Sequence, residues 1–148
     1  MIFAEEKIIN FKTEVEYLLA NHWEKAIKHK DYQLQPDWLS YYKLQEADAI
    51  KTYTARCNTA LVGYASVYTI KSLYTVNRQE AHYDMIYVSP EFRKGRVGAN
   101  LLKFVEKKLK DLGVKQITIG SLVHQPFDNL LESLNYSCIE KNYIKYIG

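Results

Sequence analysis

The fold is decided by the stretch MIYVSPEFRKGRVGANLL, which runs from Met85 to Leu102. Its first residues, up to Val88, are apolar or aromatic, as in a buried strand. Ser89-Pro90 ends that strand, and an amphipathic helix begins near Val97. The stretch therefore predicts a strand, a short basic loop with two glycines, and a helix in direct succession.

The loop between this strand and this helix has the features of an anion site. The first amides of a helix have no partner within it, and the helix dipole adds partial positive charge there. Gly95 and Gly98 allow a close backbone approach, and Arg93, Lys94 and Arg96 add positive charge. Neither G-x-x-x-x-G-K-[ST] nor an early G-x-G-x-x-G occurs, which disfavours a nucleotide triphosphatase or a dinucleotide enzyme. For the loop alone, a basic surface turn is the alternative interpretation.

The rest of the chain predicts a mixed α/β sheet in one domain spanning residues 1–148. The strand, helix, strand order around the basic loop implies a right-handed crossover and a parallel pair. A turn at Asn58-Thr59 joins two strands into an antiparallel hairpin. In chain order we expect a helix over 11–29, a helix opened by Pro36-Asp37, strands over 51–57 and 61–69, a loop over 71–80, a strand over 81–88, a helix from 97 ended by Gly113, a strand over 116–122, a helix over 127–134 and a strand over 136–146.

Composition limits the kinds of partner. The 148 residues are 47% hydrophobic and 25% charged, with a net charge of +3, which is too small for the dense basic face of a nucleic-acid-binding protein. No apolar run has membrane-spanning length, and the N-terminus lacks a signal pattern. The two cysteines fit no metal motif. We expect a cytoplasmic protein with no metal, nucleic-acid or membrane partner.

The segment Val88-Ser89-Pro90-Glu91-Phe92-Arg93 resembles the lead-in to the cofactor motif of the GCN5-related N-acetyltransferase (GNAT) superfamily. That family carries [R/Q]-x-x-G-x-[G/A] after its fourth strand. Arg93 fills the first position and Gly98 the last, but Arg96 stands at the middle glycine and Gly95 lies one residue earlier. The resemblance covers roughly residues 50–147. It is carried further by Leu61-Val62-Gly63-Tyr64 and by 130–136, and His22-Trp23-Glu24 is similar to a subgroup of phage-encoded members.

The resemblance implies a GNAT fold, with a central, mostly antiparallel sheet that is splayed between its fourth and fifth strands and has helices on both faces. Acetyl-CoA would lie in the splay, with backbone groups of the fourth strand on its pantetheine arm and loop amides on its pyrophosphate. The cofactor-binding residues expected on this basis are Ile86, Val88, Arg93, Lys94, Gly95, Arg96, Val97, Gly98 and Ala99.

The implied reaction is direct attack of a neutral amine on the thioester. A lysine-like amine is only about one part in a few thousand neutral at pH 7, so a base or a desolvating pocket must help. His82 falls where histone-acetylating members carry a glutamate base, and Asp84 is two residues on, hence on the same strand face. The alternative is a half-exposed strand histidine beside a local hydrogen-bond acceptor.

Two further positions bear on catalysis. His124 follows the strand over 116–122, near where many members place a cofactor-contacting asparagine. A contact with pantetheine, a role as base, and a simple helix start all stay open for it. The tyrosine that serves many members as general acid is replaced by Leu131, with Tyr136 and Tyr143 as substitutes.

We therefore predict an acetyl-CoA-dependent N-acetyltransferase acting on a primary amine of a small molecule or protein. The alternative is a catalytically weak or inactive CoA-binding or regulatory module that acts on a host macromolecule. The amine acceptor and the oligomeric state, including a homodimer, stay open. A phage-encoded member would work in the host cytoplasm.

Overall fold

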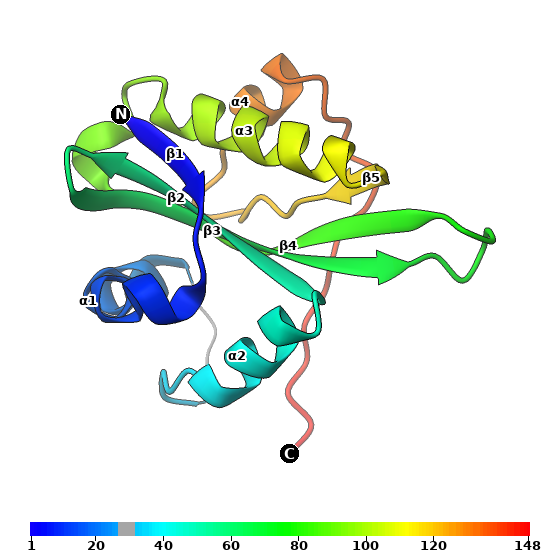
Figure 1. The fold of residues 1–148 in the computed structure, drawn as a ribbon, viewed down its shortest axis with the longest axis horizontal. Coiled ribbons are helices and arrows are strands. Elements are labelled where there is room, and N and C mark those ends of the chain that lie inside the picture. Colours follow the sequence, from blue (N-terminus) through cyan, green and yellow to red (C-terminus); the bar gives the residue numbers. More distant parts are fainter. Residues whose placement is uncertain (27–31) are drawn as a thin grey trace.

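A five-stranded sheet forms the centre of the computed structural model, which describes residues 1–26 and 32–148. The strand order is β1-β2-β3-β4-β5; the first four are antiparallel and β5 joins β4 in parallel. Helices cover both faces (Figure 1). The elements are β1 (Ile2–Glu5), α1 (Ile8–Ala26), α2 (Trp38–Glu46), β2 (Ile50–Cys57), β3 (Ala60–Lys71), β4 (Gln79–Val88), the 3-10 helix η1 (Pro90–Phe92), α3 (Val97–Asp111), β5 (Val114–Thr118) and α4 (Asp128–Ser133). The predicted mixed, mostly antiparallel sheet is confirmed.

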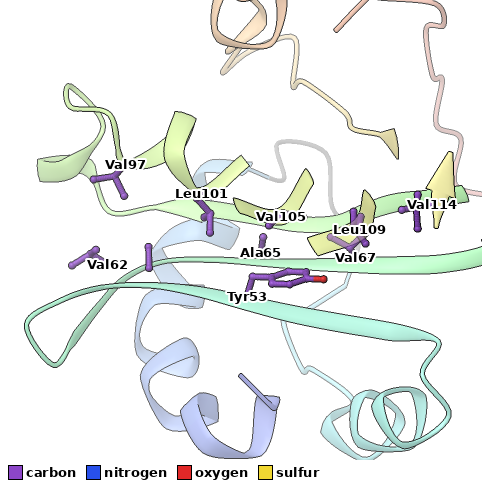
Figure 2. Close-up of a cluster of buried hydrophobic side chains, with 11 residues drawn as sticks. Tyr53, Val62, Ala65, Val67, Val97, Leu101, Val105, Leu109 and Val114 are labelled. Atoms are coloured by element: carbon purple, nitrogen blue, oxygen red, sulfur yellow. The ribbon is translucent and has the colours of Figure 1, made fainter. Parts of the chain in front are cut away.

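The helix α3 closes one face of the sheet. Its apolar stripe, with Leu101, Val105 and Leu109 fully buried, packs on inward side chains of β2 and β3 (Figure 2). Gly113 has φ +84°, a left-handed conformation that ends the helix as predicted. Leu112 continues the apolar spacing of this helix but is 49% exposed, because the helix ends at Asp111.

The helices α1 and α2 cover the opposite face. Phe11, Val15 and Leu19 of α1 are buried there, in one cluster with Tyr64 of β3 and Tyr87 of β4. The helix begins at Ile8, three residues before the predicted start, and its predicted end at residue 29 lies outside the described residues. No helix in the described part of the chain is long and apolar enough to cross a membrane.

Three sequence predictions need correction. The strand β1 was not among the predicted elements, but its four residues pair with β2 over Tyr53–Arg56. The strand β5 ends at Thr118, four residues before the predicted end. The predicted strand over 136–146 is absent, because that segment pairs with no other strand, and Ile139 and Tyr143 are exposed. Apolar content there indicated a strand, but ladder partners decide whether one forms.

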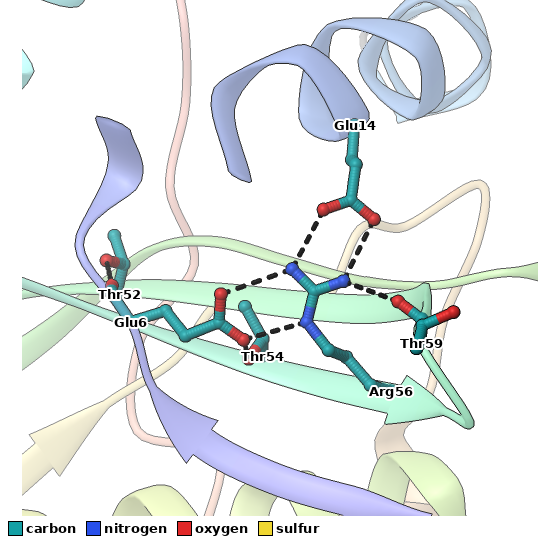
Figure 3. Close-up of polar contacts among 6 residues, drawn as sticks. All are labelled: Glu6, Glu14, Thr52, Thr54, Arg56 and Thr59. Carbon is teal, nitrogen blue, oxygen red and sulfur yellow. Dashed lines mark hydrogen bonds and ion pairs between the residues drawn. The ribbon is translucent and has the colours of Figure 1, made fainter. Parts of the chain in front are cut away.

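Arg56 ties α1 and β1 to the sheet (Figure 3). Its guanidinium donates to Glu6 at 2.8 and 3.1 Å, to Glu14 at 2.9 and 2.8 Å, and to the carbonyl of Thr59 at 2.8 Å. These hydrogen bonds lower the pKa of both carboxyl groups. The network therefore connects the first half of α1 and the end of β1 to β2.

Candidate cofactor and acyl-transfer site

The strand β4 has an uncovered edge in its second half. The strand β5 pairs with it only from Gln79 to His82, so residues 83–88 have no strand on that side among the described residues. The register with β3 also shifts here, because Val67 pairs with Tyr83 and Ser66 with Met85, which leaves Asp84 as the extra residue of a bulge. The two parallel strands thus part after one short ladder, as a splayed sheet requires.

The turn after β4 is held by its own backbone. Ser89 is buried and donates its N–H to the carbonyl of Val62 at 2.8 Å. Phe92 and Arg93 then donate to the carbonyls of Ser89 and Pro90, closing η1. The first backbone hydrogen bond into α3 runs from the N–H of Asn100 to the carbonyl of Arg96, at 2.9 Å.

Six consecutive backbone amides lie between these bonds. The N–H groups of residues 94–99 make no close, well-aligned hydrogen bond elsewhere in the described chain, although residues 93–96 form a turn. They stand at the N-terminus of a 15-residue helix, where the dipole places partial positive charge. Lys94 and Arg96 are exposed beside them. We call residues 94–99 the amide cradle; its chemistry suits a phosphate group.

The two glycines near the cradle differ in their surroundings. A Cβ at Gly95 would meet only the carbonyl oxygen of Phe92, at 3.7 Å. A Cβ at Gly98 would point at Leu130 of α4, at 3.6 Å, and at Val88, at 4.0 Å. Both are ordinary contacts, so the chain's own packing requires glycine at neither position.

Arg93 is turned away from the cradle. Its Nε donates to the carbonyl of Val88 at 2.7 Å, and its guanidinium lies 5.4 Å from the centre of the Tyr87 ring. The sequence grouped Arg93 with Lys94 and Arg96 as positive charges at one anion site. The structure separates them, because Arg93 braces the end of β4.

His82 and Asp84 share a strand but form no pair. The carboxylate of Asp84 accepts from Ser66 Oγ at 2.6 Å and from Tyr41 OH at 2.8 Å. Burial, with the nearby Asp84 carboxylate, raises the pKa of Tyr41. His82 pairs with Thr118 at the last rung of the parallel ladder, and its Nε2 is buried with no hydrogen-bond partner among the described residues. An unpartnered imidazole nitrogen therefore lies at the apex of the splay.

His124 lies beside the last turn of α1. Its Nε2 hydrogen-bonds the carbonyl of Lys25 at 2.9 Å, which joins the segment after β5 to the last turn of α1. Leu131 is buried in α4, and Tyr136 OH donates to Glu106 at 2.9 Å. Tyr143 is 91% exposed. The hydroxyl of Tyr136 is thus engaged by α3, and Tyr143 is in solvent.

His22 was not among the site residues predicted from the sequence. It lies in α1, three and four residues after Leu19 and Leu18, on the face that packs on the sheet. Its Nδ1 is 2.9 Å from Tyr64 OH and its ring is 4.9 Å from that of Tyr87. The helical spacing was the signal for this placement, since it continues the apolar stripe.

An amide cradle beside a splayed parallel pair is an arrangement that can hold a long, phosphate-bearing cofactor against a strand edge. The sequence matches the acetyltransferase (GNAT) family over residues 13–128, and the chain belongs to that family. Members of this family are N-acetyltransferases that use acetyl-CoA. No curated protein matches the chain.

Three solved structures share the fold. Ribosomal-protein-alanine N-acetyltransferase from Brucella melitensis biovar Abortus 2308 is 18% identical, over 99% of this chain and 100% of that chain, with a TM-score of 0.75. An aminoglycoside acetyltransferase from an uncultured soil sample, in complex with sisomicin, is 12% identical over 99% and 94%, with a TM-score of 0.75. A predicted acetyltransferase with acetyl-CoA from Clostridium acetobutylicum is 9% identical over 98% and 95%, with a TM-score of 0.77.

Proposed function

We propose that this protein transfers the acetyl group of acetyl-CoA to a primary amine. The observation that carries the proposal is the amide cradle, whose N–H groups make no well-aligned hydrogen bond among the described residues and lie at a helix start, shortly after a strand whose edge is uncovered. The N–H groups of residues 94–99 would hold the pyrophosphate. The open edge of β4 at Ile86 and Val88 would bind the pantetheine arm. Bound there, acetyl-CoA supplies an acyl group on a good leaving thiol.

The acceptor amine would come from the α2 side of the sheet. Asp84 is exposed there and is held by Ser66 and Tyr41, so its carboxylate is available to a cationic amine. His82, whose Nε2 lacks a described partner at the apex of the splay, would accept the proton that the amine must lose. Two of the structural relatives are an acetyltransferase of a ribosomal protein's alanine and one of aminoglycosides, which supports amines as the acceptor class.

Calorimetric titration of acetyl-CoA and thiol release in the presence of amines test this proposal. We expect saturable binding and steady release of CoA with at least one amine. Arg96→Glu should weaken binding by roughly tenfold or more, because it places a negative charge at the cradle. Lys107→Glu, which reverses an exposed charge of the same helix away from its start, is the matched control. Equal affinities for the two variants would contradict the cradle.

A second candidate function is a CoA-binding module without turnover. Leu131 is buried at the position of the usual tyrosine acid, and Tyr136 OH is engaged with Glu106. This candidate predicts binding of acetyl-CoA with no thiol release above the rate in buffer, for small amines, amino-terminal peptides and proteins alike. Steady release with any of them excludes it.

A further inference from the structure

His22 is fixed on two sides by aromatic residues of the sheet. Its Nδ1 lies 2.9 Å from Tyr64 OH on β3, and its ring centre is 4.9 Å from that of Tyr87 on β4. The two tyrosine rings are themselves stacked, with centres 5.5 Å apart. An imidazole in this setting has little rotational freedom, so its second nitrogen, Nε2, has a defined position.

The hydrogen bond to Tyr64 indicates which nitrogen carries the proton. Tyr64 is 2% exposed, and His22 Nδ1 is the acceptor available to its hydroxyl among the described residues. A buried O–H group left without an acceptor is costly, which favours donation from Tyr64 to Nδ1. The proton of the neutral ring is then on Nε2. Burial, helped by the charge of Arg93, lowers the pKa of His22 to about 4, so the ring stays neutral near pH 7.

The location of His22 connects it to the proposed cofactor site. Tyr87 lies between Ile86 and Val88, on the half of β4 that β5 leaves uncovered. Arg93, at the beginning of the basic loop, is 5.4 Å from the same ring. His22 Nε2 has no hydrogen-bond partner in the described part of the chain, and the His22 ring lies against Tyr87 of the strand proposed to carry the thioester.

We propose that His22 is a further catalytic residue, whose Nε2–H donates to the carbonyl oxygen of the acetyl group; this rests on the proposed function. The donor stabilises the negative charge that develops on that oxygen as the amine attacks. The new N–C bond forms, the C–S bond breaks with its electron pair on sulfur, and the proton lost by nitrogen passes through His82 to the thiolate. A neutral imidazole suits this role better than a base, because its proton is a donor throughout.

The first test reads the tautomer directly. Long-range ¹H–¹⁵N correlation spectra of the full chain, without ligand, should show His22 protonated on Nε2 and unprotonated on Nδ1 at pH 7. Tyr64→Phe should remove that preference. A proton on Nδ1 in the wild-type protein would overturn the proposal, whatever the activity.

The second test separates binding from turnover. Thiol release is measured with kanamycin, spermidine and a peptide beginning with alanine, and acetyl-CoA affinity by calorimetry. We expect His22→Leu to lower kcat by about 100-fold while the Kd for acetyl-CoA changes less than about threefold. His22→Gln, whose amide N–H₂ can replace Nε2–H, should recover part of that loss. Tyr17→Leu, an 85% exposed position on the same helix, should match the wild type.

The outcomes distinguish the two claims. If the wild-type protein turns over an amine and His22→Leu keeps kcat within about threefold of the wild-type value, the catalytic role of His22 is contradicted and the proposed function stands. If the wild-type protein binds no acetyl-CoA, the proposed function itself fails. A loss of binding and turnover together in His22→Leu, with a lowered melting temperature, would assign His22 to packing and overturn its catalytic role.

Discussion

The Nε of Arg93 donates to the carbonyl of Val88 at 2.7 Å, so the first basic residue of the loop is folded back onto the strand that precedes it. The basic residues of the loop therefore have different structural roles. Arg93 holds the end of β4 and stacks on Tyr87, whereas Arg96 is exposed at the start of α3.

This separation predicts different effects of two alanine substitutions. Arg93→Ala should lower the free energy of unfolding by about 1–2 kcal/mol, because it removes a charged hydrogen bond and a cation–π contact. Arg96→Ala should leave stability within about 0.5 kcal/mol and raise the Kd for CoA several-fold. Urea unfolding and calorimetry measure the two. Equal stability of the variants would show that Arg93 does not brace the strand.

Gly63 sets how closely β3 approaches the end of β4. A Cβ there would lie 3.0 Å from the carbonyl oxygen of Tyr87 and 3.5 Å from the Cβ of Ala55, so the backbone must give way. Gly63→Ala should cost roughly 1–3 kcal/mol of unfolding free energy and weaken CoA binding through displacement of Val88. Gly120→Ala, where a Cβ meets nothing within 4 Å, is the control and should be neutral. A neutral Gly63→Ala would contradict the close approach.

Acid should destabilise the fold through His22. Its pKa falls from 6.5 to about 4 on folding, so between these values the unfolded chain binds a proton that the folded chain does not. Stability therefore falls as pH falls through this window, by roughly 2–3 kcal/mol between pH 6.5 and 4.5. The carboxyl groups of Glu6 and Glu14, whose pKa is lowered, keep their contribution above 4.5 and lose it only in more acid solution.

The measurement is the pH dependence of the urea midpoint for the wild type and His22→Gln. The variant lacks the titrating group, so its stability should fall less steeply from pH 6.5 to 4.5. Parallel curves would show that His22 titrates alike in the folded and unfolded chains.

The Arg56 network should matter more than an exposed ion pair of the same type. The side chains of Arg56 and Glu6 are 19% and 20% exposed, whereas Lys7 and Glu46 are 68% and 74% exposed. Arg56→Met should lower the free energy of unfolding by roughly 1–3 kcal/mol, since it leaves two part-buried carboxylates without their donor. Lys7→Met should lower it by less than about 0.5 kcal/mol. Chemical denaturation compares them. Equal losses of unfolding free energy would show that solvent screens the ion pairs of Arg56 as fully as that of Lys7.

Local pattern predicted those parts of the fold whose periodicity is strong. The stripe of α3, the Asn58 hairpin turn and the parallel pair β4–β5 followed from spacing and turn residues, and Asn58 adopts φ 54°. The short strand β1 was missed because its four residues become a strand only through their ladder with β2. Segment 136–146 has strand-like composition but no ladder partner in the structure.

The candidate site, like the fold, could be predicted only where the pattern lies within one local stretch of sequence. The amide cradle follows from a strand, a basic loop and a helix in succession, which local sequence contains. The partners of Asp84 come from α2 and β3, 43 and 18 residues away, so no spacing along one strand predicts them. His22 reaches Tyr64 across 42 residues for the same reason.

The amide cradle is tested most directly by ¹H–¹⁵N correlation spectra recorded during titration with CoA. The amides of residues 94–99 make no well-aligned hydrogen bond to another described group, so binding of the pyrophosphate should shift their proton resonances downfield together and to saturation. Amides at the far end of α3, near Lys110, should move little. Saturating CoA that leaves residues 94–99 unshifted, or that shifts another surface in their place, would contradict the account.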